Sequence, residues 1–385
     1  MYKWRNKNRV NTICRADGRK VPDIRLLISL CILAMLVTGC KTLSKRNEPA
    51  KGKVDVLDLL PSANNPRNSE GDFITLKNGK ILYIYSHFTG KSGGDYGHAY
   101  LASRYSTNGG KTWSKTDQVV IKQEGDMNVM SVSLLRLRNG NIALFYGRKN
   151  SKMDDIPLMR ISTDEAKTWS EPIPCITDRK GYFVLNNNRV IQLKNGRLIM
   201  AVALHETPED PTWHNGGTLF SYFSDDNGAT WKSGQPVPAP QGVVMQEPGL
   251  VELKNGNIFM FIRTDAGVQY AAYSGDHGET WSEARPTGIA SPLSPASIAR
   301  IPSTGDLLMV WNNNGKNQHR TPLNIAVSKD EGKTWQHIKT LEDDPEGVFC
   351  YTAIHFTGKD VLLAYANWKT MGSTIVRLPL QWIYK

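Results

Sequence analysis

Five residues with chemically useful side chains stand at related places in a chain of 385 residues. Glu247 precedes an alternating apolar run, and Arg263 ends the run that returns from the next turn. Asp95 and Arg320 lie in polar segments that follow such returning runs, and Tyr351 opens the last run of this kind. A carboxylic acid can donate a proton, a phenol beside a carboxylate can act as a nucleophile, and guanidinium groups can hold an anion. The set therefore suits acid–base and nucleophilic chemistry on an anionic substrate.

A repeated unit of four strands must position these residues. In residues 246–281, alternating apolar residues enter a turn at Asn255-Gly256, return, and are followed by a third apolar run. Asn-Gly between two alternating runs is a strong hairpin signal, because the tight turn needs positive φ at both central residues. Six hairpins predict six β-sheets. The turns are Asn78-Gly79, Asn139-Gly140, Asn195-Gly196, Asn255-Gly256, Thr304-Gly305 and Thr357-Gly358.

Five of the units continue into a box with the pattern S-x-D-x-G-x-T-W. In such a turn the Ser and Asp side chains bond nearby backbone groups, Gly takes the left-handed position and Trp packs between neighbouring sheets. The first box has Asn108 in the Asp place and the second has Ala166 in the Gly place, so we expect those two turns to be looser. The boxes lack the ligand spacing and closing Glu of an EF-hand, and we expect no metal ion and no cofactor. The boxes end at Trp113, Trp169, Trp231, Trp281 and Trp335.

The period of about 55 residues predicts one all-β domain over residues 54–385, built as a closed ring of six four-stranded antiparallel blades. Residues 54–60 form a short alternating strand with no hairpin partner nearby. The C-terminal unit, residues 351–383, has no box and is one strand short. We therefore expect the N-terminal strand to complete the last blade and to remove the edge that an open array would expose.

The blade topology also predicts where a site lies. In a four-stranded blade the 1–2 and 3–4 turns share one face, and the 2–3 loops and blade-to-blade connections share the other. Residues that begin strand 1, end strand 2 or lie in the 2–3 loop must gather on the face opposite the boxes. Asp95, Glu247, Arg263, Arg320 and Tyr351 all meet this condition, so we expect them at one mouth.

The N-terminal residues read as a targeting segment. Residues 1–39 carry eight basic and two acidic residues around an apolar run, 26–37, that is too short to span a bilayer. Residues 37–40, Val-Thr-Gly-Cys, resemble the lipobox of bacterial lipoproteins, which implies cleavage before Cys40 and its lipidation. The alternative is an ordinary signal peptide with an incidental cysteine. Residues 40–53 are polar and read as a flexible tether. Lys41 after the cysteine favours the outer membrane of the cell envelope, on its periplasmic or surface side.

Charge and cysteine content exclude some partners. The chain carries a net charge of +11, and loss of the leader leaves about +5. Residues 54–385 hold no basic run, so nucleic acid is not a favoured partner. Cys175 and Cys350 lie in different predicted blades, which favours two separate thiols over a disulfide. We expect a monomer.

The boxes, the six units and the five polar residues together resemble the sialidase (neuraminidase) superfamily, whose fold is a six-bladed β-propeller. The resemblance covers residues 54–385. It implies that Asp95, eleven residues before the first box, is the acid/base and that Tyr351 is the nucleophile with Glu247 as its base. It also implies that Arg263 and Arg320 are two arms of an arginine triad that holds the substrate carboxylate.

One departure concerns the first arm of that triad. Sialidases open the first blade with an arginine, whereas this chain has Ser69-Glu70-Gly71 there and Arg67 two residues too early. Arg67 could swing into the site. Otherwise the site holds its anion with two guanidinium groups, or Glu70 accepts a hydrogen bond from a substrate hydroxyl. The alternative is that Glu70 has no role in the site and is a solvated charge on a loop.

The resemblance implies a retaining exo-glycosidase that removes terminal sialic acid or a similar acidic sugar from glycans. A carboxylate on the anomeric carbon would repel an Asp or Glu nucleophile, and a phenol avoids that repulsion. Two other functions remain open: hydrolysis or elimination on another acidic glycan of the uronic-acid type, and glycan binding without catalysis by a lipoprotein. Further candidate sugar contacts are Asn186, Asn187, Asn188 and Arg189 at the start of the third blade, Ser131 in the second, and Trp213 and His214, which also fit a packed loop.

Overall fold

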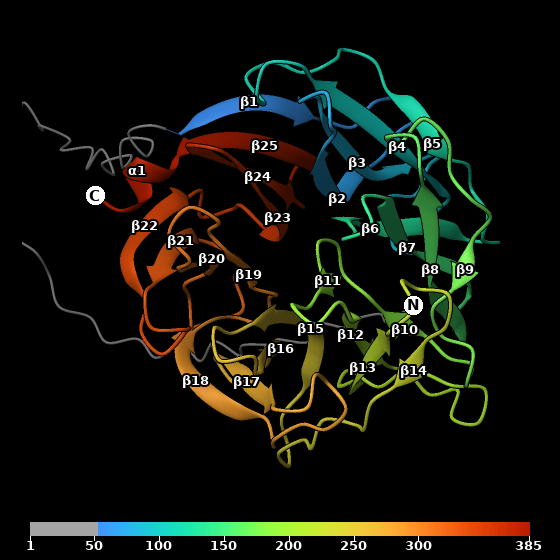
Figure 1. The fold of residues 1–385 in the computed structure, drawn as a ribbon, viewed down its shortest axis with the longest axis vertical. Helices are drawn as coiled ribbons and strands as arrows, with labels where there is room; N and C mark the ends of the chain where they lie inside the picture. The colour runs from blue at the N-terminus through green and yellow to red at the C-terminus, as the bar shows by residue number, and fades with distance from the viewer. Residues whose placement is uncertain (1–52) are drawn as a thin grey trace, which may run out of the picture. The chain divides into compact units, whose positions relative to one another are not determined.

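The computed structural model describes residues 53–385, and these residues form six antiparallel sheets arranged around a central axis like the blades of a propeller (Figure 1). The chain runs from blade to blade in order around the ring, as the colours of Figure 1 show. The prediction of an all-β, six-bladed propeller is confirmed.

The first three blades come from the first half of the ring. In the third blade the inner strand is interrupted, and its two short pieces, β10 and β11, both pair with β12. The strands are β2 (Asn68–Thr75), β3 (Ile81–Phe88), β4 (Ala99–Ser106) and β5 (Gln118–Ile121) in blade one; β6 (Asn128–Arg136), β7 (Ile142–Ser151), β8 (Asp154–Ser162) and β9 (Ile173–Pro174) in blade two; and β10 (Phe183–Val184), β11 (Ile191–Gln192), β12 (Leu198–Leu204), β13 (Thr218–Ser224) and β14 (Lys232–Ser233) in blade three.

The remaining blades complete the ring, and the short helix α1 (Leu380–Ile383) follows the last strand. The strands are β15 (Met245–Glu252), β16 (Ile258–Thr264), β17 (Val268–Ser274) and β18 (Arg285–Ala290) in blade four; β19 (Ser297–Arg300), β20 (Leu307–Asn312), β21 (Leu323–Ser328) and β22 (Gln336–Glu342) in blade five; and β23 (Phe349–Thr357), β24 (Asp360–Asn367), β25 (Gly372–Pro379) and the N-terminal β1 (Val54–Leu59) in blade six.

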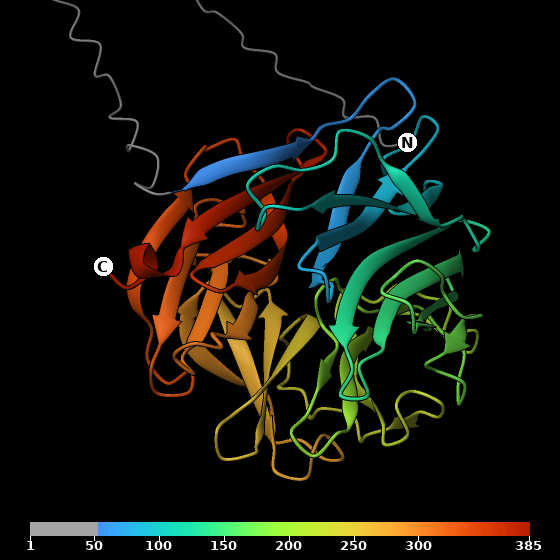
Figure 2. The same ribbon diagram turned by 45° about the horizontal axis from the view of Figure 1, so that its top comes forward.

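The N-terminal strand closes the ring as predicted. Strand β1 pairs antiparallel with β25, from Val54 opposite Arg377 to Leu59 opposite Ser373. Figure 2 shows β1 lying along the outer edge of β25. Both ends of the described chain therefore build one sheet, which leaves the ring without an open blade.

Apolar residues between neighbouring blades form the core. Within residues 53–385, six large apolar clusters each join two adjacent blades, including the pair made of blades six and one. In that last cluster, Leu59 and Ile375 of blade six pack with Tyr83 and Tyr85 of blade one. Burial of apolar surface at every blade interface stabilises the ring as a whole.

The box turns have the hydrogen bonds expected of them, and the expectation of two looser turns is wrong. The Asn108 Oδ1 accepts from Thr112 N at 3.0 Å, as the Asp does in the other boxes. The Ala166 N–H still donates to Ser162 Oγ at 2.8 Å, with Ala166 held at a φ of 62°. An amide oxygen can replace a carboxylate oxygen as acceptor, and alanine can adopt the left-handed backbone at some cost, so both turns keep their geometry.

Some predictions fall on residues that the structure does not describe. The leader, residues 1–39, the lipidation of Cys40 and the tether, apart from Lys53, lie outside the described residues. Among residues 53–385, no helix has the length and apolar character needed to cross a membrane. Cys175 and Cys350 are both buried free thiols, as predicted.

Candidate active site

In four blades, a β-bulge in the inner strand places a side chain in the central pocket. Their inner strands each carry a β-bulge, where the pairing register shifts and one residue adopts left-handed backbone. A bulge bends the strand and redirects a side chain, which here turns toward the pocket. All four residues line the pocket. They are Glu70 in β2 (φ 52°), Ser131 in β6 (φ 63°), Glu247 in β15 (φ 43°) and Tyr351 in β23 (φ 56°).

The residues after Glu247 explain why the bulge forms at this position. A Cβ atom on Gly249 would lie 2.2 Å from the Phe261 ring and 3.0 Å from Arg189 Nη1, so only glycine fits there. The register between β15 and β16 shifts between Gln246 and Gly249. The Glu-Pro-Gly sequence therefore lets the strand pass close to Phe261 while Glu247 points inward.

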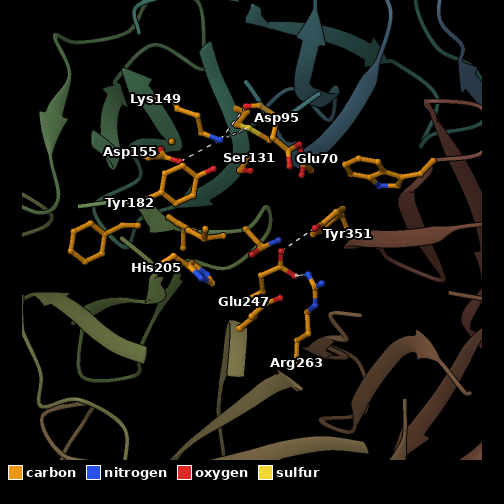
Figure 3. A pocket seen from close by; sticks show the side chains of 18 of the residues that line it. Glu70, Asp95, Ser131, Lys149, Asp155, Tyr182, His205, Glu247, Arg263 and Tyr351 are labelled. Atoms are coloured by element: carbon orange, nitrogen blue, oxygen red, sulfur yellow. Dashed lines mark hydrogen bonds and ion pairs between the residues drawn. The ribbon is translucent and has the colours of Figure 1, made fainter. Parts of the chain in front are cut away.

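Tyr351, Glu247 and Arg263 form a connected group in the pocket (Figure 3). The Tyr351 hydroxyl donates to Glu247 Oε1 at 2.9 Å, and Arg263 Nη1 donates to Glu247 Oε2. The side chains of Glu247 and Arg263 are 11% and 10% exposed, so water screens the ion pair only weakly. The predicted contact between the phenol and its carboxylate is present.

The surroundings of this group keep Glu247 ionised and Tyr351 neutral. Burial would raise the pKa of Glu247, but Arg263, Arg320 and the hydrogen bond from Tyr351 outweigh it and lower that pKa. Burial, together with the charge of Glu247, raises the pKa of Tyr351 well above its usual value. The resting group is thus a neutral phenol hydrogen-bonded to an ionised carboxylate, which can receive its proton when the phenol attacks an electrophile.

Arg320 faces the same group from the loop after β20. Its guanidinium carbon lies 5.9 Å from the centre of the Tyr351 ring, and Arg320 lines the pocket. Among residues 53–385, no carboxylate forms an ion pair with Arg320. Burial would lower the pKa of Arg320, but Cys350, Tyr351 and Glu247 outweigh it and raise that pKa. A permanently charged guanidinium without a carboxylate partner can bind an anion.

Arg67 does not enter the pocket and instead joins two carboxylates of blade one. Its Nη1 donates to Asp95 Oδ1 at 2.6 Å and its Nη2 to Glu70 Oε2 at 2.9 Å. The guanidinium is 1% exposed and lies between the rings of Phe88 and Trp368, at 4.5 and 4.2 Å. Of the alternatives for the missing arm, the swing of Arg67 into the site is therefore wrong for this structure. Two guanidinium groups, Arg263 and Arg320, face the pocket.

Asp95 and Glu70 differ in exposure. The Asp95 side chain lines the pocket and is 51% exposed, so it can reach a leaving group at the mouth. Glu70 is 5% exposed, and burial raises its pKa, with the charge of Asp95 adding to the rise and Arg67 opposing it. Glu70 is therefore a pocket residue and not a solvated loop charge.

The third blade requires a correction. Asn187 and Arg189 do not line the pocket: Asn187 Nδ2 donates to the backbone oxygens of Gly71 at 2.8 Å and Tyr351 at 3.1 Å. Arg189 Nη2 donates to the backbone oxygen of Ala296 at 2.6 Å, and burial lowers the pKa of Arg189 to about 10. Both side chains support the backbone behind the pocket instead of contacting a ligand.

Neighbouring polar residues divide in the same way. Asn188 Nδ2 donates to the buried Asp72 at 2.9 Å and so ties blade three to blade one. Asn186, by contrast, lines the pocket, as does Ser131. Trp213 also lines it and stacks on His205, with ring centres 4.7 Å apart and planes at 8°. His214 does not line the pocket.

The sequence reasoning missed a group of pocket residues in blades two and three. Lys149 near the end of β7, Asp155 in β8, Tyr182 before β10 and His205 after β12 all line the pocket. Lys149 and His205 stand at the end of the second long strand of their blades, as Arg263 does. The same topological rule, applied to every blade, would have found them.

The pocket at the axis encloses about 420 Å³, within the range of small-molecule sites. It opens on the face opposite the box turns, where the sequence predicted a site. Asp95, Glu247, Arg263, Arg320 and Tyr351 all line it, together with Glu70. Within residues 53–385, no group of three or more His, Cys, Asp or Glu side chains is arranged to hold a metal ion.

Comparisons with known proteins agree with this architecture. Residues 91–362 match the family described as BNR repeat-like domain. The chain is 24% identical over 324 residues to a sialidase of Bacteroides fragilis, covering 75% of this chain and 58% of that protein. It is 28% identical over 298 residues to a sialidase of Micromonospora viridifaciens, covering 66% of this chain and 43% of that protein. The chain thus spans less than two thirds of these relatives.

Solved structures show the same fold. A Hadza microbial sialidase superposes with a TM-score of 0.69 at 18% identity, covering 83% of this chain and 66% of that one. A protein of unknown function from Dyadobacter fermentans superposes with a TM-score of 0.65 at 20% identity, covering 85% of this chain and 99% of that one. With its family match over most of the propeller and its six blades, this chain belongs to the BNR repeat-like domain family, within the sialidase superfamily of propellers.

Proposed function

We propose that the propeller is a retaining exo-glycosidase of sialidase type that removes a terminal acidic sugar from a glycan. The observation that carries the proposal is the 2.9 Å hydrogen bond from the Tyr351 hydroxyl to Glu247 Oε1, in a pocket that also presents two guanidinium groups. Relatives named sialidase, at 24% and 28% identity, support the same class of activity.

The first step replaces the glycosidic bond by a bond to the enzyme. Arg263 and Arg320 hold the sugar carboxylate by charge-assisted hydrogen bonds. Asp95 donates a proton to the leaving oxygen while the Tyr351 oxygen attacks the anomeric carbon and its proton passes to Glu247. The aglycone leaves as an alcohol, and the sugar is held as an aryl glycoside on Tyr351.

The second step restores the enzyme. Asp95, now ionised, takes a proton from a water molecule that attacks the anomeric carbon from the face that the aglycone left. The bond to Tyr351 breaks, and Glu247 returns the proton to the phenolate. Two displacements at one carbon retain its configuration.

The test has three readouts on the purified protein. Sialosides should release free sugar, and proton NMR of the first product should show retained configuration. A 2,3-difluorinated sugar acid should lose its anomeric fluoride to the attacking phenol and add its mass, less that of HF, to the peptide that contains Tyr351. Tyr351→Phe should remove most turnover, while Tyr273→Phe, at a phenol on the outer surface that is 44% exposed, should not. Unchanged turnover in Tyr351→Phe would remove this residue from the mechanism.

A second candidate is action on another acidic glycan, of the uronic-acid type, by hydrolysis or elimination. The observation that favours it is Glu70, a carboxyl group at the bulge of blade one where the superfamily resemblance implies an arginine. Incubation with sialosides and with uronic-acid glycans, followed by identification of the sugar released, separates the two. An unsaturated product identifies elimination, and binding without release of sugar identifies a glycan-binding protein.

We also propose that the propeller is tethered to the outer membrane of the cell envelope through lipid on Cys40. The support is the Val-Thr-Gly-Cys sequence at residues 37–40 and Lys41 after it. Metabolic labelling with a fatty acid should mark the wild type and not Cys40→Ser. Labelling of both proteins would contradict the anchor.

A further inference from the structure

The inner strand of blade three is interrupted, and the segment between its two pieces lies behind the central pocket. Residues 185–190 separate β10 from β11 and belong to no strand. Within this segment, Asn187 and Arg189 are only 2% and 3% exposed, and neither lines the pocket. Buried backbone and amide groups require hydrogen-bond partners, and this segment finds its partners in other blades.

The Asn187 side chain joins two of the bulges that carry pocket residues. Its Nδ2 donates to the backbone oxygen of Gly71 at 2.8 Å and to that of Tyr351 at 3.1 Å. Gly71 follows Glu70 in the bulge of blade one, and Tyr351 is itself the left-handed residue of the bulge in blade six. Within residues 53–385, neither Gly71 nor Tyr351 has a partner in the strand pairing of its blade. The two amide hydrogens of Asn187 thus bond two carbonyl groups at positions where the strand pairing is broken.

The rest of the segment borders the two other bulges. The Asn188 N–H donates to the backbone oxygen of Val132 at 3.0 Å, and Val132 follows Ser131 in the bulge of blade two. Arg189 lies beside Gly249 at the end of the bulge in blade four, where a Cβ atom on that glycine would be 3.0 Å from Arg189 Nη1. One segment of blade three therefore borders the bulges of blades one, two, four and six.

The position of Tyr351 depends on such contacts. Its hydroxyl bonds Glu247 of blade four at 2.9 Å, across the pocket shown in Figure 3. Its backbone is held at a φ of 56°, a conformation that a residue with a Cβ atom keeps only when its surroundings impose it. The bond from Asn187 to the Tyr351 carbonyl is one such restraint.

We propose that Asn187 is a positioning residue, which holds the backbone of Tyr351 so that the phenol oxygen meets both Glu247 and the anomeric carbon. Asn187 acts through Tyr351 and not on the sugar. Attack requires the reacting atoms to be closely aligned, so loss of this restraint should slow bond formation more than it weakens sugar binding. The inference rests on the proposed function, because that function makes Tyr351 the nucleophile.

The test separates the chemical step from sugar binding. Asn187→Leu removes both donors at similar size, so kcat/KM on a fluorogenic sialoside should fall by about 10–100-fold. The inhibition constant of 2-deoxy-2,3-dehydro-N-acetylneuraminic acid, an unreactive sugar acid, should change by less than about threefold. The reason is that Asn187 bonds blades one and six, whereas Arg263 and Arg320 hold the carboxylate from blades four and five.

A conservative variant should recover part of the loss. Asn187→Asp keeps the shape of the side chain, and burial beside two carbonyl oxygens favours its neutral form, which has one donor instead of two. Its kcat/KM should therefore fall by at least about threefold, but by less than that of Asn187→Leu. If Asn187→Leu does not fold, Asn187→Asp decides the question, and a smaller loss than about threefold overturns the inference.

A matched control is Asn324→Leu in β21 of blade five. Asn324 is 5% exposed, and its Nδ2 donates to Lys339 O and to Thr340 Oγ1, both at 3.2 Å. This variant also loses buried hydrogen bonds and should lose stability in urea denaturation, yet its kcat/KM should stay within about threefold of the wild type. Equal losses of kcat/KM in the two leucine variants overturn the inference. So does a rise in the inhibition constant of Asn187→Leu that matches its loss of kcat/KM.

The outcome is separable from that of the proposed function. Sugar release by the wild type, with equal kcat/KM in Asn187→Leu and Asn324→Leu, rejects this inference and leaves the glycosidase proposal standing. A wild type that releases no sugar from sialosides or from uronic-acid glycans rejects the glycosidase proposal, and this inference with it.

Discussion

The box turns at one end of the blades and the pocket bulges at the other both use left-handed backbone, but of the two only the box turns use glycine for it. At the box turns, the residue whose N–H bonds the Ser side chain is a glycine in four boxes and Ala166 in the other. At the pocket, the left-handed positions of the four bulges hold no glycine. Left-handed backbone costs a residue with a Cβ atom about 1–2 kcal/mol. Each box turn also holds the residue before that position in left-handed backbone, and in four boxes this residue is not glycine: Glu165, Asn227, His277 and Glu331. Both ends of the blades therefore accept strain, and the box turns relieve it with glycine mainly at the position that bonds the Ser side chain.

A second contrast lies within the pocket, between blades one and four. Glu70 and Glu247 occupy equivalent bulges, their side chains are only 5% and 11% exposed, and each pairs with an arginine. Their pKa values nevertheless move in opposite directions: that of Glu70 is raised and that of Glu247 is lowered. Glu70 shares its single arginine, Arg67, with a second carboxylate. The number of charges around a buried carboxyl, and not burial alone, decides its charge.

The largest expected effect concerns Glu247 as the base of the pair. Glu247→Gln keeps the shape of the side chain but cannot accept the phenol proton, so turnover should fall by about 10²–10⁴-fold. Glu283→Gln, at an exposed position of blade four, should change turnover little. Steady-state kinetics on a fluorogenic sialoside measures both. Near-normal turnover in Glu247→Gln would contradict the role of Glu247 as the base. The contrast in charge between Glu70 and Glu247 would then have no counterpart in their function.

The next effect concerns the arginine of blade one. Arg67→Met keeps apolar packing between Phe88 and Trp368 but leaves Glu70 without its cation, which should lower the free energy of unfolding by about 3–5 kcal/mol. Urea denaturation measures the loss, and the further change Glu70→Gln should restore part of it. Arg179→Met, which breaks an exposed pair with Asp178, should cost no more than about 1 kcal/mol. Equal losses in the two variants would contradict a buried network.

The two glutamates should also give opposite pH dependences of stability. The raised pKa of Glu70 adds stability that is present below about pH 4.3, the unfolded value, and lost as the pH rises through the folded value. The lowered pKa of Glu247 adds stability that is present above about pH 4.3 and lost as the pH falls through the folded value. As the pH rises to neutral, the melting temperature of Glu70→Gln should increase relative to that of the wild type. As the pH falls into the acid range, the melting temperature of Glu247→Gln should increase relative to that of the wild type. Thermal unfolding across that range checks both, and differences of the same sign would contradict the contrast.

Much of this fold was predictable because its signals are local. An Asn-Gly turn between alternating runs defines a hairpin from a few residues, and the box repeats count the blades. The closing strand followed from a missing fourth strand. The meeting of Glu247 and Tyr351 followed too, because equivalent positions in a closed ring of blades face the same axis.

The parts that the sequence could not predict depend on non-local geometry. Arg67 pairs with Asp95 only because the loop between β3 and β4 returns over blade one, and residue spacing does not contain that path. In blade three, the segment between β10 and β11 has no strand pairing. Which of Asn186 and Asn187 faces the pocket is then set by contacts to other blades, such as the bond from Asn187 to Gly71.

The smallest effect tests the strain itself at both ends of the blades. Ala166 and Ser131 hold φ angles of 62° and 63°, and glycine adopts this backbone without a Cβ penalty. Ala166→Gly and Ser131→Gly should therefore each raise the free energy of unfolding by about 1 kcal/mol or somewhat less, given the greater freedom of glycine in the unfolded chain. Only Ser131→Gly removes a hydroxyl from the pocket, so only this variant should alter the KM for the sugar. Chemical denaturation and kinetics on both variants measure the two effects. A loss of stability in both would show that left-handed backbone is not a cost at these positions, whereas a gain in Ala166→Gly alone would show that the Ser131 side chain contributes packing that offsets its strain.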